Sequence, residues 1–178
     1  MNESKRYLID DHNLAPDLSL TLYHITLAWV ISRGNRFMLT LQPDLYDDPM
    51  QLERLYSLGQ IVSLNINDRP NDWFSRILSK IFVEQRNMVA ISGSPSTVFL
   101  QVMTQIDVPL KVGIGDLCPV EDLQIFLDER RLYFSSDYGR TQILILTEEE
   151  LNSLHQVLQE AGFDITCVIL APSYLTDA

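Results

Sequence analysis

Short apolar runs alternate with helix-like patterns from residue 6 to about residue 128, and this alternation limits which folds the chain can adopt. Between the runs, apolar residues recur with helical spacing, most clearly over residues 71–86. Strands that alternate with helices are typical of βα units, whose strands pair in parallel and carry helices on both faces. The runs interpreted as strands are residues 7–9, 37–41, 61–66, 88–92 and 110–114.

Start and stop signals predict a helix after each of these strands. Capping residues and helix-opening prolines precede several of the helical patterns, and glycines follow two of them. Five strands and five helices match a five-stranded, doubly wound parallel sheet of flavodoxin-like order 2-1-3-4-5. The sequence therefore predicts an α/β fold for residues 1–128. The expected helices begin near Asp17, Asp48, Asn71, Ser94 and Pro119, and the last of them ends near Asp128.

Residues 129–178 follow a different pattern and are expected to form an acidic C-terminal extension of small α+β type. Asp137-Tyr138-Gly139 is a turn signal between two apolar runs. Thr147 and Glu150 have the spacing of a capping box and predict a helix. Whether these strands extend the main sheet or form a separate subdomain is left open. The expected order of strand, strand, helix and strand occupies residues 132–134, 142–146, 147–161 and 164–170.

The charge of the chain opposes direct contact with nucleic acid. Thirteen Lys and Arg residues face 24 Asp and Glu residues, which gives a formal net charge of −11. The last basic residue is Arg140, and residues 141–178 contain six acids and no base. A phosphate backbone is repelled by such a field unless a local basic patch overcomes it. We therefore expect no direct binding of nucleic acid.

The cysteine and hydropathy patterns indicate a cytoplasmic protein. Cys118 and Cys167 do not make the framework of a secreted disulfide protein, so a reducing compartment is expected. The longest apolar-rich stretch, residues 18–31, is interrupted by hydroxyl residues and a histidine. Because it is too short and too polar to span a bilayer, we expect no membrane association.

Three short motifs agree with one family. Tyr7-Leu-Ile-Asp10-Asp11-His12 is similar to the first strand and acidic loop of a receiver domain. The passage from Pro119-Val-Glu-Asp-Leu to Glu-Arg-Arg-Leu-Tyr-Phe-Ser135 is similar to the link that follows such a domain. Leu146-Thr-Glu-Glu-Glu150 is similar to the opening of a helix-turn-helix. The chain thus resembles response regulators of the NarL/LuxR type, and the resemblance implies a receiver-like domain over residues 1–128.

The resemblance implies a phosphorylation site of four parts, of which two are present. Asp10 and Asp11 match the acidic pair that holds Mg²⁺ through oxygen ligands. Ser92 matches the hydroxyl residue that ends the fourth strand. Asn65 stands where the phosphate-accepting aspartate belongs, and an amide cannot serve as that nucleophile. Asp68, three residues later, is the alternative acceptor.

The other parts of the family pattern are incomplete. The fifth strand ends without the lysine that binds phosphoryl oxygens, since Lys111 lies at its start. After Gly162 the pattern predicts a strand instead of a scaffold helix and a recognition helix, and that segment contains no Lys or Arg. The resemblance is therefore to an atypical response regulator with a degenerate pseudo-receiver and no complete helix-turn-helix.

These features favour a non-enzymatic regulatory protein that acts by protein–protein interaction. The expected partner is a transcription regulator or another signalling protein, in a homodimer or a heterodimer. An acidic inhibitor or adaptor that masks a basic surface is the first alternative. A phosphorylatable receiver is the second. We expect no catalytic residue and no cofactor, with Mg²⁺ at Asp10 and Asp11 as the alternative.

Overall fold

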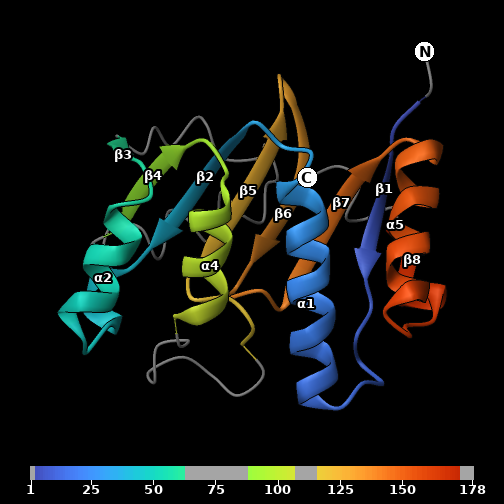
Figure 1. The fold of residues 1–178 in the computed structure, drawn as a ribbon, viewed down its shortest axis with the longest axis horizontal. Helices are drawn as coiled ribbons and strands as arrows, with labels where there is room; N and C mark the ends of the chain where they lie inside the picture. Colours follow the sequence, from blue (N-terminus) through green and yellow to red (C-terminus); the bar gives the residue numbers. More distant parts are fainter. Residues whose placement is uncertain (1–2, 63–87, 107–115, 173–178) are drawn as a thin grey trace.

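A single antiparallel sheet forms the centre of the protein (Figure 1). The structure is a computed structural model that describes residues 3–62, 88–106 and 116–172. Within these residues the sheet has eight strands, and all seven pairings between neighbours are antiparallel. In order across the sheet, the strands are β3 (Gln60–Val62), β4 (Val89–Gly93), β2 (Arg36–Leu41), β5 (Asp122–Leu127), β6 (Arg130–Ser136), β7 (Thr141–Leu146), β1 (Lys5–Ile9) and β8 (Val168–Leu170).

The described α-helices lie side by side on one face of this sheet, in the order α2, α4, α1, α5 (Figure 1). α1 contacts both α4 and α5. Arg54 of α2 donates a hydrogen bond to Gln105 of α4 at 3.2 Å, and this contact joins α2 to the other helices of the layer. The helices are α1 (Pro16–Ile31), α2 (Pro49–Tyr56), α4 (Thr97–Gln105) and α5 (Glu148–Glu160), and short 3₁₀ turns occupy Pro43–Leu45 and Ile165–Cys167.

Side-chain caps set the first turns of three helices. Asp48 accepts a hydrogen bond from the backbone N–H of Met50 at the start of α2. Ser96, rather than the predicted Ser94, caps α4 by accepting from the N–H of Phe99. Each such cap satisfies a backbone donor that the helix itself leaves unpaired. α1 begins at Pro16 after Ala15, whose side chain cannot cap the helix, and the proline at the first position has no N–H that needs a partner.

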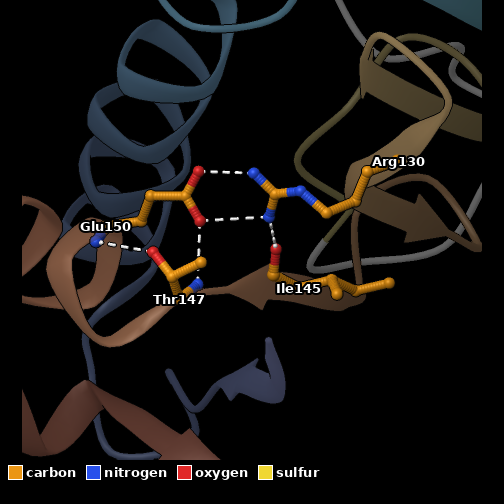
Figure 2. A network of polar contacts seen from close by, with 4 residues as sticks. All are labelled: Arg130, Ile145, Thr147 and Glu150. Carbon is orange, nitrogen blue, oxygen red and sulfur yellow. Dashed lines mark hydrogen bonds and ion pairs between the residues drawn. The ribbon is translucent and has the colours of Figure 1, made fainter. Parts of the chain in front are cut away.

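The predicted capping box of α5 is confirmed and extends into an ion pair with β6 (Figure 2). Glu150 accepts from the N–H of Thr147 at 2.8 Å, and the hydroxyl of Thr147 accepts from the N–H of Glu150 at 3.3 Å. Arg130 donates two hydrogen bonds to the Glu150 carboxylate, at 3.0 and 2.5 Å, and a third to the carbonyl of Ile145 at 2.6 Å. The network fastens the start of α5 to the sheet.

The core lies between the helix layer and the side of the sheet that faces it. Phe37 of β2 packs on Phe99 of α4, with 4.3 Å between ring centroids. Leu22 and Leu27 of α1 and Leu123 of β5 have no exposed surface. Burial of each such side chain stabilises the fold by about 1.5–3 kcal/mol. Apolar contact therefore holds the helices on this face.

The prediction of a five-stranded, parallel, flavodoxin-like α/β fold is wrong. Among the described strands no pairing is parallel, and the helices lie on one face, whereas a doubly wound sheet has them on both. The receiver-like description of residues 1–128 is wrong for the same reason. Hydrophobic periodicity identifies a strand but neither its neighbours nor their direction. Only Asp128 and Glu129 connect β5 to β6, and so short a connection requires an antiparallel pair.

The predicted helix near residues 119–128 is also wrong, because most of it is strand β5. Leu123 and Ile125 are completely buried on the helix-facing side and alternate with Asp122 and Gln124. β5 pairs with β2 on one edge and with β6 on the other, so its backbone groups are satisfied by neighbouring strands. Leu123, Ile125 and Phe126 also fit one side of a helix, and so short a run remains ambiguous until its partners are known.

Several other predicted elements are confirmed with shifted ends. The runs at 7–9, 37–41 and 88–92 are β1, β2 and β4, and the helices expected near Asp17 and Asp48 are α1 and α2. β3 confirms the start of the run at 61–66 as far as Val62. The rest of that run, the helix at 71–86 and the strand at 110–114 lie outside the described residues.

The strands that follow residue 128 belong to the same sheet as those before it. β6 and β7 form the predicted hairpin and lie between β5 and β1, and β8 pairs with β1 at the edge. Of the last predicted strand, the first part is a 3₁₀ turn and only Val168–Leu170 is extended. Among the described helices, none combines the length and the apolar character needed to cross a membrane.

Candidate functional site

A pocket of about 730 Å³ opens at the start of α1. Residues 11–20, which run from the loop after β1 into α1, meet there with the segment before β5 and the end of the β6–β7 turn, so three separate parts of the chain form its walls. We call it the acidic pocket. It is lined by Asp11, His12, Leu14, Pro16, Asp17, Ser19, Leu20, Asp116, Leu117 and Arg140.

Local hydrogen bonds hold the loop after β1 at the rim of the acidic pocket. The N–H of Asp10 donates to the carbonyl of Cys167 at 2.8 Å, which ties the end of β1 to the turn before β8. One carboxylate oxygen of Asp10 accepts from the N–H of His12 at 3.3 Å and lies 3.0 Å from its Nδ1. The N–H of Leu14 donates to the carbonyl of Asp11 at 2.9 Å. These bonds place Asp11, half-buried, and His12, exposed, in the lining.

The turn between β6 and β7 brings Arg140 to the opposite wall. Asp137, Tyr138 and Gly139 have φ values of 54°, 57° and 88°, a left-handed run that favours Gly at its last position. The carbonyl of Tyr138 accepts from the N–H groups of Leu117 and Cys118, both at 2.8 Å, and fixes the turn to the segment before β5. This contact sets the position of the residue that follows the turn.

Arg140 forms an ion pair inside the acidic pocket. Its Nε lies 2.5 Å from Oδ1 of Asp116, whose side chain is only 2% exposed. Its Nη1 lies 3.8 Å from Oδ2 of Asp137. The lining thus has the carboxylates of Asp11, Asp17 and Asp116 against one guanidinium, so its net charge is negative.

Apolar side chains complete the walls of the pocket. Leu14, Leu20 and Leu117 lie among the carboxylates, and Leu20 is 39% exposed although it is a large apolar residue. A negative pocket with aliphatic walls suits a cation on an aliphatic stem, since the stem contacts the leucines and the charged head reaches the carboxylates.

The structure separates the residues that the sequence grouped as a degenerate phosphorylation site. Asp10 and Asp11 follow β1, whereas Ser92 lies on β4, where its hydroxyl donates to the carbonyl of Phe37 at 3.0 Å. Four strands lie between β4 and β1, which corresponds to about 24 Å at roughly 4.8 Å per strand. Asn65 and Asp68 lie outside the described residues. The described parts of the expected site are therefore not neighbours.

No group of three metal-ligating side chains forms in the part of the chain that the structure describes. Asp10 and Asp11 are consecutive, but His12 is the group that pairs with Asp10. The described structure thus adds no third ligand of this kind to the acidic pair proposed for Mg²⁺.

The buried thiol and phenols under α1 are not placed to act on a substrate. Burial raises the pKa of the Cys118 thiol to about 11, and it also raises the pKa values of Tyr23 and Tyr133. All three side chains are completely buried, and the hydroxyl of Tyr133 donates to Oε1 of Gln142 at 3.2 Å. These groups are protonated at neutral pH and closed to solvent, so their role is in packing.

Comparison with protein-family models, with curated proteins and with solved structures finds no match for this chain. The acidic pocket therefore has to be interpreted from its own residues. Sequence reasoning identified Asp11 but missed Asp116 and Arg140. The turn signal at Asp137-Tyr138-Gly139 was recognisable, but nothing local indicated that Arg140 would meet a carboxylate 24 residues earlier in the chain.

Proposed function

We propose that the protein is a non-enzymatic binding protein whose acidic pocket receives a Lys or Arg side chain of a basic partner protein. The observation behind this proposal is the convergence of Asp11, Asp17 and Asp116 on one leucine-walled pocket that contains a single arginine. It agrees with the acidic inhibitor or adaptor considered from the sequence. The regulatory role expected there would follow from occupying the basic surface of the partner.

Electrostatic attraction at long range and at short range supports this function. At long range, the formal charge of −11 attracts a basic surface and increases the rate of encounter. At short range, the half-buried Asp11 and the exposed Asp17 offer carboxylates to a cation that enters the pocket. The ion pair of Asp116 with Arg140 keeps the inner wall in place.

The test is binding of a fluorescent oligolysine peptide, measured by anisotropy at low salt and at physiological salt. We expect Asp11→Asn combined with Asp17→Asn to weaken binding about tenfold at low salt, since two local charges together contribute about 1.4 kcal/mol. Raising the salt should weaken the wild-type complex and reduce the difference between the proteins, because screening acts mainly on exposed charges.

The matched control removes the same number of charges elsewhere. Glu53 on α2 and Glu129 in the β5–β6 turn are both exposed and are not part of the pocket lining. Glu53→Gln combined with Glu129→Gln gives a protein of the same net charge, so only the local contribution differs. Equal weakening by the two double variants would show that only the overall charge matters and would refute a specific site. Unfolding curves of both variants check that the fold is intact.

A further inference from the structure

Arg140, the arginine in the lining of the acidic pocket, lies within reach of two carboxylates. Its Nε lies 2.5 Å from Oδ1 of Asp116, and its Nη1 lies 3.8 Å from Oδ2 of Asp137. The hydrogen bond to Asp116 is donated by Nε, on the side of the guanidinium. Because a guanidinium carries five N–H donors, the same side chain can contact the second carboxylate at the same time. Arg140 therefore has a close partner and an alternative partner.

The two carboxylates differ in exposure. The side chain of Asp116 is 2% exposed and that of Asp137 is 66% exposed, while Arg140 itself is 43% exposed. A carboxylate as buried as Asp116 is strongly destabilising when its cation is removed, whereas water solvates an exposed one. Arg140 can thus leave Asp116 at low cost only if another cation takes its place there. Asp137 would then offer it a second ion pair.

The acidic pocket is the place where such a cation would arrive. Asp116 and Arg140 both belong to its lining, together with Asp11 and Asp17. A basic side chain that enters past Asp11 and Asp17 meets a charge of its own sign on Arg140 and an opposite charge on the carboxylate that Arg140 holds. The entering cation and Arg140 therefore compete for Asp116.

We infer, building on the proposed function, that Arg140 determines which basic side chain the acidic pocket accepts: an arginine of the partner replaces it on Asp116, and Arg140 moves to Asp137. This exchange keeps the buried carboxylate paired throughout. A guanidinium suits the position better than an ammonium does, because it is less strongly hydrated and loses less on entering a buried site. A lysine of the partner would instead stay at the half-buried Asp11 and the exposed Asp17.

The test compares two fluorescent peptides, an oligolysine and the same oligolysine with its central lysine replaced by arginine. Their length and charge are equal, so only the head group differs. We expect the wild type to bind the arginine peptide roughly fivefold more tightly. Asp137→Asn should abolish this preference, because Arg140 loses the carboxylate to which it moves. Asparagine tolerates the left-handed φ of 54° at this position, so the turn is kept.

Combining Asp137→Asn with Arg140→Gln separates the exchange from a general effect of charge. Arg140→Gln alone should bind both peptides more tightly, because the competing guanidinium is gone. In that background Asp137→Asn should change either affinity by less than about twofold, since the two substitutions act through one contact. Equal weakening by Asp137→Asn in both backgrounds would show that Asp137 acts only as a local charge and would overturn the inference. Weaker binding by Arg140→Gln would also overturn it, because Arg140 would then support the pocket wall without competing.

A measurement on the wild-type protein does not depend on the stability of Arg140→Gln. The Nε–H signal of Arg140 in a ¹⁵N NMR spectrum, assigned with Arg140→Lys, reports the hydrogen bond to Asp116. It should shift when the arginine peptide saturates the protein and shift much less with the oligolysine. A signal that stays unchanged at saturation with the arginine peptide would refute the exchange.

The control variant is Glu129→Gln, which removes an exposed acid from the β5–β6 turn, outside the pocket lining. It should leave the preference for the arginine peptide as it is in the wild type. Loss of that preference in Glu129→Gln would show that any exposed acid can produce the effect and would overturn the role of Asp137. If neither peptide binds the wild type, the proposed function fails and the exchange with it. If both bind with equal affinity, only the exchange is refuted.

Discussion

Replacing Glu150 by glutamine removes the charge from the network that joins α5 to β6 (Figure 2). In the wild type, this carboxylate accepts two hydrogen bonds from Arg130 and one from the N–H of Thr147. The amide has one oxygen in place of two, so Arg130 loses both its counter-ion and part of its hydrogen bonding. The start of α5 would then be held mainly by the hydroxyl of Thr147.

The size of the expected loss of unfolding free energy depends on how deeply the ion pair of Arg130 and Glu150 is buried. The side chains of Arg130 and Glu150 are 30% and 18% exposed. Breaking a fully buried pair costs about 3–5 kcal/mol, whereas a fully exposed pair contributes about 0–1 kcal/mol. The intermediate exposure places the loss of unfolding free energy at about 2 kcal/mol. For a protein of this length, that corresponds to a fall in Tm of roughly 4–8 °C.

The pH dependence gives a second measurement of the same pair. Burial alone would raise the pKa of Glu150, but the hydrogen bonds and charge of Arg130 and the N–H of Thr147 outweigh it and lower that pKa. A carboxyl whose pKa is lowered by folding stabilises the protein above its unfolded pKa of about 4.3, and this contribution is lost as the pH falls through the lower folded value. The advantage of the wild type over Glu150→Gln should therefore be complete at pH 7 and disappear in acid.

Thermal and urea unfolding followed by circular dichroism measure both effects. Glu149→Gln is the matched control, because Glu149 is an exposed acid in the same first turn of α5. It should change the unfolding free energy by about 0.5 kcal/mol or less. If Glu150→Gln were no more destabilising than Glu149→Gln at pH 7, or if its deficit persisted unchanged in acid, the ion pair would not hold α5 as argued.

Two further predictions concern the turn and the thiols near the acidic pocket. In urea unfolding, Gly139→Ala should lower the free energy of unfolding more than Gly162→Ala does, by about 1 kcal/mol. Both glycines have φ near +85°, but a Cβ at 139 would lie 3.1 Å from Cβ of Cys118, whereas at 162 it would meet nothing within 4 Å. Equal losses of unfolding free energy in the two variants would show that the close approach to Cys118 does not contribute. Burial raises the pKa values of Cys118, to about 11, and Cys167, so neither thiol should be alkylated by iodoacetamide in the native protein at pH 8, and both should react in urea. Rapid native labelling of Cys118, detected by mass spectrometry, would contradict its placement.

Elements whose signals are local could be predicted from the sequence. The capping box of α5, the proline and aspartate that open α2 and the turn between β6 and β7 depend on residues within four positions of each other. Hydrogen bonds to nearby backbone groups and a left-handed φ are decided over that distance, so these predictions are confirmed. The acidic loop after β1 was recognised in the same way.

The arrangement of these elements was decided only by the tertiary structure. The apolar spacing of Leu123, Ile125 and Phe126 is compatible with a helix, and β5 is a strand because β2 and β6 satisfy its backbone groups on both edges. The direction of each strand depends on pairings between distant segments, which hydrophobic periodicity does not encode. The acidic pocket is likewise a product of topology, because Asp11, Asp116 and Arg140 meet only when the β6–β7 turn packs against the segment before β5. Local residue patterns thus determined the helix caps, the β6–β7 turn and the charge of this protein, while long-range backbone pairing and core packing decided that residues 122–127 are a strand, the order of the sheet and the acidic pocket.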